Sequence, residues 1–142
     1  MAVTDETYRP MDHAGLVVLS FDECLELLAA QPVGRVAFAQ SGDIEIFPVN
    51  HCVVDGTVAF RVADGSKLGA AIQGSVVAFE VDAYDTGRRE GWSVVVKGRA
   101  ELVADEATLA RLRATGLQPW ASRVPRQEWI VVRADAVSGR RL

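Results

Sequence analysis

The feature that most constrains the fold is a series of short apolar segments, separated by turn residues, between positions 33 and 63. The segments cover residues 33–39, 44–54 and 57–63, and Ser41-Gly42-Asp43 and Asp55-Gly56 supply the turn residues between them. Short apolar runs bounded by turn residues are typical of strands. Asp55-Gly56 separates the last two segments and suits the positive φ angles of a two-residue hairpin. The pattern predicts an antiparallel meander of three strands.

Pro48 lies in the middle segment of this meander and has no backbone N–H to offer a neighbouring strand. We therefore expect an edge position or a bulge at this residue. An interrupted ladder would leave the backbone of Val49 and Asn50 free to bind another group.

Helix signals occur at three places. Ser20 and Glu23 have the spacing of a capping box, and apolar residues then recur at helical spacing. Asp105 is a suitable cap for a later helix. We expect helices from Ser20 to about Gln31, over residues 67–73, and between Asp105 and Gly116.

The remaining apolar runs predict strands at residues 75–81, 92–103 and 128–133, with charged or polar loops at 82–91 and 117–126. Gly98, in the middle of the second run, predicts a bend of the kind found at a barrel corner. The fold class is therefore α+β, mainly β, with six or seven antiparallel strands and two or three helices. A small barrel is the simplest closure, because it leaves few strand edges exposed.

The length of 142 residues suits one domain, which we place at 15–142 after an N-terminal arm at 1–14 that is flexible or orders against a partner subunit. The net charge of −4 and the lack of a clustered basic face argue against a nucleic-acid partner. No segment has the apolar length of a membrane span, and the first residues do not resemble a signal peptide. We expect a cytoplasmic protein with no membrane partner.

Residues 58–71 predict a strand, a tight turn and the start of a helix, and this junction is a candidate phosphate site. Ser66 is a suitable N-cap, and the first turn of a helix presents backbone N–H groups that favour an anion. Arg61 and Lys67 add positive charges that can converge on the same point. An ordinary connection with solvated basic side chains is the alternative. The order Gly-Ser-Lys excludes the nucleotide P-loop pattern.

Metal and acid–base chemistry find little support in the sequence. Cys24 and Cys52 are the only cysteines, and His13 and His51 the only histidines, with no spacing typical of a zinc site. We expect no metal and no disulfide. Glu80 and Asp82 are interpreted as part of a solvated strand face, so no catalytic residue is assigned.

Several motifs in order resemble the pyridoxamine 5′-phosphate oxidase-like group with the flavin-binding split barrel, over about residues 16–142. The resemblance implies a split-barrel homodimer that binds flavin mononucleotide (FMN) in two clefts between the subunits. The motifs are Val33-Gly34-Arg35-Val36-Ala37-Phe38, Pro48-Val49-Asn50, Phe60-Arg61 with Ser66-Lys67, residues 77–82, 91–100, and Ser138-Gly139-Arg140-Arg141-Leu142.

The resemblance also implies roles for individual residues. Arg61, Ser66 and Lys67 would hold the flavin phosphate, in agreement with the interpretation of the junction itself. The backbone of residues 48–50, with Phe60, would border the isoalloxazine ring, and Trp92-Ser93 would approach it. Further candidates, contributed by the other subunit, are Trp120 and Arg140-Arg141, although the tryptophans suit ordinary core or interface packing equally well.

The chain ends at Leu142 without the C-terminal Arg and His residues by which the oxidases grip pyridoxal phosphate, which argues against oxidation of pyridoxamine phosphate. We expect a flavin-dependent oxidoreductase acting on a small organic acceptor. One alternative is a deazaflavin-dependent reductase, in which arginines in the two loops would bind the acidic coenzyme tail. The other is a non-catalytic protein that holds flavin or haem, with His13 or His51 as axial ligand. The loop arginines are Arg88, Arg89, Arg123 and Arg126.

Overall fold

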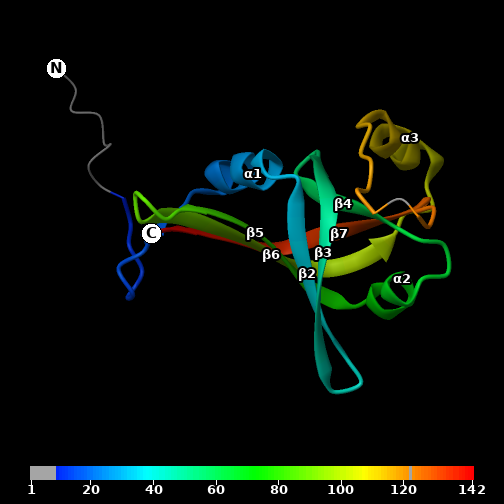
Figure 1. Ribbon diagram of the computed structural model, residues 1–142, viewed down its shortest axis with the longest axis horizontal. Coiled ribbons are helices and arrows are strands. Elements are labelled where there is room, and N and C mark those ends of the chain that lie inside the picture. Colours follow the sequence, from blue (N-terminus) through cyan, green and yellow to red (C-terminus); the bar gives the residue numbers. More distant parts are fainter. Residues whose placement is uncertain (1–8, 122) are drawn as a thin grey trace.

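Antiparallel strands dominate the computed structural model, which describes residues 9–121 and 123–142 (Figure 1). In this part of the chain the strands form one sheet, and three helices flank it. The strands are β1 (Val17–Val18), β2 (Val33–Gln40), β3 (Asp43–Val54), β4 (Thr57–Val62), β5 (Val76–Asp85), β6 (Glu90–Leu102) and β7 (Glu128–Arg141). The helices are α1 (Phe21–Ala30), α2 (Lys67–Ile72) and α3 (Glu106–Ala114).

The order of strands in the sheet is β1-β7-β4-β3-β2-β5-β6, and an additional pairing of β6 with β7 closes strands β2 to β7 into a barrel. β1 is an extra strand that pairs with the end of β7. The mainly β, antiparallel barrel with three helices confirms the fold class expected from the sequence.

The meander of β2, β3 and β4 has the predicted hairpins. Asp55 and Gly56 both adopt positive φ, at 51° and 74°. β3 pairs with β4 only over its last four residues, from His51 to Val54, whereas it pairs with β2 along residues 43–50. Pro48 therefore lies on a stretch of β3 that has one edge free in the described structure, as its missing N–H predicts.

β6 and β7 form the longest ladder, which shifts register between Lys97 and Gly98. A Cβ at Gly98 would overlap the backbone carbonyl of Arg133, so only glycine allows the two strands to approach this closely. The predicted bend at Gly98 is confirmed as a bulge of the barrel wall.

Two apolar clusters hold the fold together. The larger one fills the barrel and includes the fully buried Phe60 and Phe79, and α1 and α2 cover it through Leu28 and Ile72. The smaller one lies between α3 and the outer face of β4 and β7, where Leu112 packs among Ala59, Trp129 and Val131.

The capping residues expected from the sequence are in place. The Ser20 hydroxyl accepts a hydrogen bond from the Glu23 N–H, and the Glu23 carboxylate accepts one from the Ser20 N–H. The carboxylate of Asp105 accepts from the N–H of Thr108 at 2.8 Å. Among the described residues, no helix combines the length and apolar composition that crossing a membrane requires.

Two strands extend beyond their predicted ends. β7 continues beyond the expected limit at Arg133 as far as Arg141. β5 continues into the loop expected at 82–91 and ends at Asp85. Both extensions pair with β6, so a partner strand rather than local hydrophobic pattern determines them. Residues 9–14 of the expected arm fold back on β1 through a bridge between Met11 and Val17, and residues 1–8 lie outside the described part.

Candidate functional site

The residues predicted to contact a flavin fall at opposite ends of β7. Arg61 pairs with Trp129 at the start of β7, whereas Trp92 pairs with Arg141 at its end. Twelve positions separate Trp129 from Arg141, which at about 3.3 Å per residue is roughly 40 Å. Figure 1 shows β7 running from the end that carries α3 to the end near both termini. Within one chain, Arg61 and Trp92 therefore cannot contact the same flavin.

Arg61 projects from β4 toward the face covered by α3. Its Nη1 donates to the carbonyl of Leu117 at 3.0 Å, and its guanidinium carbon lies 5.5 Å from the centroid of the Trp129 ring. The Nε–H is buried and has no hydrogen-bond partner among the described residues. A buried donor without an acceptor is costly, so this N–H is suited to an anionic ligand.

Two cavities lie beside Arg61, with volumes of about 370 Å³ and about 280 Å³. They share Arg61, Gln118 and Gln127, and no described residue that lines either of them is acidic. The first is completed by Arg113, Gly116, Leu117 and Trp129. The second is completed by Pro119, Ala121, Val124, Pro125 and Arg126.

Ser66 and Lys67 form the predicted start of α2. The Ser66 hydroxyl accepts a hydrogen bond from the N–H of Gly69 at 3.0 Å, which confirms its role as N-cap. The backbone of Lys67 begins the helix, but its side chain lies outside the described part of the structure. Ser66 is not among the described residues that line the two cavities beside Arg61. The observed contact of Arg61 is therefore with the loop at 116–127, through the carbonyl of Leu117.

Asn50, next to the free edge of β3, connects this loop to the sheet. Its Oδ1 accepts from the backbone N–H of Trp120 at 2.8 Å, and its Nδ2 donates to the carbonyl of Pro32 at 3.3 Å. The Trp120 side chain itself remains 71% exposed. The side chain of Val49 packs against the barrel core. The sequence indicates a role for the backbone of Asn50, whereas the role of its side chain depends on the position of the loop.

Phe60 has no exposed surface, and its ring lies 6.3 Å from that of Phe79 inside the barrel. The ring is thus part of the core. The side chain could contact a ligand only if the barrel rearranged. Its position therefore does not support the predicted contact between Phe60 and an isoalloxazine ring.

Trp92 and Ser93 lie at the far end of the barrel. Trp92 is half-buried against the core and lines a cavity of about 290 Å³ together with Tyr84, Arg88 and Arg141. The Tyr84 side chain is 79% exposed. This end therefore offers two aromatic rings at one surface, together with two arginines and the two acids Asp85 and Glu90.

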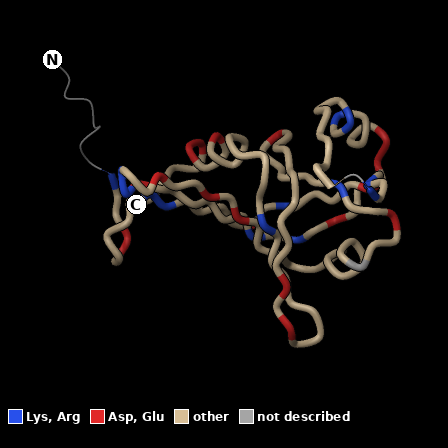
Figure 2. Tube along the Cα trace, viewed as in Figure 1, with Lys and Arg blue, Asp and Glu red and all other residues tan. Residues whose placement is uncertain are grey.

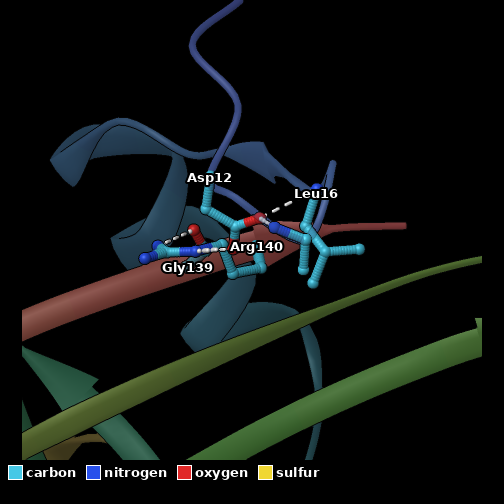
Figure 3. Close-up of polar contacts among 5 residues, drawn as sticks. Asp12, Leu16, Gly139 and Arg140 are labelled. Atoms are coloured by element: carbon cyan, nitrogen blue, oxygen red, sulfur yellow. Dashed lines mark hydrogen bonds and ion pairs between the residues drawn. The ribbon is translucent and has the colours of Figure 1, made fainter.

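Arg140 is engaged by the N-terminal segment, as Figure 3 shows. Its Nε donates to Oδ2 of Asp12 at 2.9 Å, and its Nη1 donates to the carbonyl of Gly139 at 2.9 Å. Oδ1 of Asp12 accepts from the N–H groups of Leu16 and Ala14. The hydrogen bond from Leu16, followed by those from Arg140 and Ala14, lowers the pKa of Asp12. The predicted contact of Arg140 with a flavin thus competes with this ion pair.

His51 is buried, and its Nε2 lies 2.7 Å from the carbonyl of Leu28. Burial lowers the pKa of His51, so the ring is held neutral. A side chain in this position does not reach the surface, which removes the support for His51 as a haem ligand. Cys24 and Cys52 are both unpaired.

Glu80, Asp82 and Arg35 form a cluster on the outside of the barrel that the sequence did not reveal. Nη1 of Arg35 lies 3.5 Å from a carboxylate oxygen of each acid. Burial and the neighbouring Asp82 carboxylate raise the pKa of Glu80 to about 7. Alternation along β5 places both acids on one face, but the position of Arg35 depends on the pairing of β2 with β5.

Comparison with known proteins gives relatives over nearly the whole chain. An uncharacterised protein of Mycobacterium tuberculosis is 38% identical over 138 residues, which cover 94% of this chain and 90% of the relative. The structure of an FAD-binding protein from Mycobacterium smegmatis is 36% identical and superimposes with a TM-score of 0.76, covering 88% of this chain and 97% of that one. An FAD-binding protein from Mesorhizobium loti is 26% identical, with a TM-score of 0.70 and coverage of 89% and 98%.

The model of the pyridoxamine 5′-phosphate oxidase family matches residues 20–141, which is most of the chain. The closed, mainly β barrel agrees with the fold expected from this resemblance. The chain belongs to the pyridoxamine 5′-phosphate oxidase family.

Proposed function

We propose that this protein binds a flavin nucleotide and uses Arg61 to hold its phosphate. The observation that carries the proposal is the buried Nε–H of Arg61, which has no acceptor among the described residues and lies beside cavities without acidic lining. A phosphate supplies the missing acceptor and balances the charge. FAD binding by relatives that are 36% and 26% identical supports the binding of a flavin nucleotide.

Ser66 and Lys67 are proposed to complete the phosphate site from the start of α2. Ser66 already orders this turn as N-cap, and the backbone N–H groups that follow carry partial positive charge. Pro48, Val49 and Asn50 would border the ring system, because β3 has a free edge there. Their contribution is orientation through backbone groups.

The flavin site is proposed to be shared by two copies of the chain. About 40 Å of strand separates Arg61 from Trp92 and Ser93, so a second copy must supply the latter pair if both serve one flavin. A two-fold axis would create two equivalent sites.

An apolar outer face supports such a homodimer. Ile44 and Ile46 are 78% and 62% exposed, and their partners across the ladder are Ala39 and Ala37. The side chains of these paired residues lie on the same side of the sheet. An exposed apolar face of this kind is typical of a surface that a partner covers.

The proposed activity is oxidoreduction of a small organic acceptor. A bound flavin supplies hydride transfer, while Arg61 holds the phosphate and the surrounding residues position the ring and limit water access. The unpaired Cys24 and Cys52 suit a reducing compartment such as the cytoplasm. Turnover of reduced flavin in the presence of an added acceptor tests catalysis, and binding without turnover would identify a flavin carrier instead.

The identity of the flavin is decided by parallel fluorescence titrations with FMN, FAD and a deazaflavin coenzyme at one salt concentration. The sequence favours FMN, and the FAD-binding relatives favour the dinucleotide. Arg88 and Arg141 line one cavity beside Trp92 and are a reason to include the deazaflavin with its acidic tail, although Asp85 and Glu90 in the same lining balance their charge. A coenzyme that binds at least tenfold tighter than the others, ~1.4 kcal/mol, is the preferred one.

A further inference from the structure

The two cavities beside Arg61 differ in chemistry, and their order along the loop at 116–127 is informative. Each cavity is lined by two arginines and two glutamines, but the smaller one adds two prolines, an alanine and a valine, whereas the larger one adds Gly116, Leu117 and Trp129. Both contain Arg61, Gln118 and Gln127, so one ligand can extend from the first cavity into the second. The ligand that fits has an anionic part joined to a planar or apolar part.

We infer that these cavities bind the ADP portion of FAD, with the diphosphate in the larger cavity and the adenine in the smaller one. The inference rests on the proposed flavin function and makes it more specific, because FMN has neither a second phosphate nor an adenine. It assigns Arg113, Gln118 and Gln127 to a nucleotide site that the sequence did not indicate.

The larger cavity has the donors that a diphosphate requires. Arg61 reaches it from β4 and Arg113 from α3, so two guanidinium groups approach from different elements. Among the described residues, the ion pair of Arg113 is a distant one, at 3.7 Å, with Glu106, whose side chain is 85% exposed. Such a pair contributes little, and a phosphate can replace it. Figure 2 shows basic positions in both α3 and the loop below it, at the end of the molecule away from the termini.

The smaller cavity has the composition of a site for a planar base. Pro119, Ala121, Val124 and Pro125 provide apolar walls, and the Gln118 and Gln127 amides can donate to and accept from the edge of a purine. Arg126 donates to the carbonyls of Ala121 and Val124, so it holds the loop in shape. The hydrogen bond from the Trp120 N–H to Asn50 fixes the same loop to the sheet.

Arg113→Ala tests the inference, with Arg111→Ala as matched control. Both arginines are on α3 and are similarly exposed, at 60% and 62%, but Arg111 pairs with Asp55 and does not line either cavity. Affinities for FAD, FMN and ADP are measured by titration calorimetry for the wild type and both variants. We expect wild-type protein to bind FAD at least about tenfold tighter than FMN, and ADP to compete with FAD.

Arg113→Ala should weaken FAD and ADP by about tenfold and leave FMN unchanged, whereas Arg111→Ala should change none of the three. Equal affinity of the wild type for FAD and FMN, or equal effects of the two substitutions on FAD, would overturn the inference while leaving flavin binding intact. If neither flavin binds, the proposed function fails. The binding of ADP alone then decides whether the nucleotide site exists. Binding of ADP that depends on Arg113 supports the nucleotide site, and no binding of ADP overturns it.

Discussion

The guanidinium group of Arg61 lies over the indole of Trp129, 5.5 Å from the ring centroid, and the two residues are direct partners across β4 and β7. Alternation along β4 places Arg61 on the face toward α3 and the loop at 116–127, away from the barrel interior, and this contact lies on that face. It leaves the Nε–H buried without an acceptor in the described structure, which is the basis of the proposed phosphate site.

Mixing two variants with weakened flavin binding tests whether one flavin site is built from two chains. Arg61→Ala and Trp92→Ala would each damage both sites of a homodimer, because every site needs Arg61 from one copy and Trp92 from the other. Heterodimers of the two variants would contain one intact site, so random mixing should restore about a quarter of the flavin sites. Flavin fluorescence of the mixture after subunit exchange measures this fraction, and no recovery would argue that the residues do not share a site across the interface.

The Glu80 cluster predicts a stability that falls as pH rises. The pKa of Glu80 is about 7 in the folded protein against an ordinary value of 4.5, so between these values the folded state binds the additional proton. The free energy of unfolding then decreases as pH rises from about 4.5 through about 7. Urea denaturation at about pH 5 and about pH 8 should show a smaller loss for Glu80→Gln than for the wild type. Equal losses for both proteins would refute the assignment.

Asp82→Asn serves as a second variant in this experiment. It removes one of the causes that raise the pKa of Glu80 and keeps the shape of the side chain. The carboxyl of Glu80 should therefore titrate at lower pH in the variant, which NMR detects directly. A titration unchanged by the substitution would assign the shift to burial alone.

Gly98→Ala should destabilise the barrel by about 1–3 kcal/mol, the usual range for overpacking. The new Cβ would collide with the backbone of Arg133 in the paired strand, and backbone atoms cannot move aside as a flexible side chain does. Gly87→Ala is the control, because a Cβ there would meet only a carboxylate oxygen of Asp85 at 3.4 Å. Similar unfolding free energies for the two variants would contradict the role of Gly98 in closing the ladder.

Asp12→Ala should release the segment that precedes β1. The variant loses the acceptor for the N–H groups of Ala14 and Leu16 and the ion pair with Arg140. The amide of Leu16 should then exchange with solvent faster, as hydrogen exchange measures. Asp22→Ala, a change in the first turn of α1, is the control and should leave this amide unaffected.

The sequence predicted those features that depend on local chemistry. The Ser20 capping box, the hairpin at Asp55-Gly56 and the bend at Gly98 each follow from what a few neighbouring residues can adopt. The second half of β7 was missed because its residues from 134 onward are mostly exposed and lack an alternating apolar pattern. It is a strand because β6 provides a partner for it.

The candidate site was predictable only in part, because some of its features depend on contacts between residues far apart in the sequence. The positive charge of Arg61, close to a predicted helix start, indicates a phosphate site, and the structure confirms Ser66 as the cap of that helix. Alternation along the strand already places Arg61 on the face opposite Phe60. The cavities could not be predicted, because they depend on a loop that Asn50 holds from seventy positions away. The separation of Arg61 from Trp92 likewise appears only once the register of β7 with its neighbours is known.

The most direct test of the central claim compares FMN with riboflavin in fluorescence titrations of the wild type and Arg61→Ala, with Arg133→Ala as an exposed control. Loss of one charge-assisted contact should weaken FMN binding by roughly 1.5–3 kcal/mol. Riboflavin has no phosphate, so its affinity should not change, and Arg133→Ala should behave as wild type. An equal loss for FMN and riboflavin, or no binding of either by the wild type, would contradict the proposal that Arg61 holds a flavin phosphate.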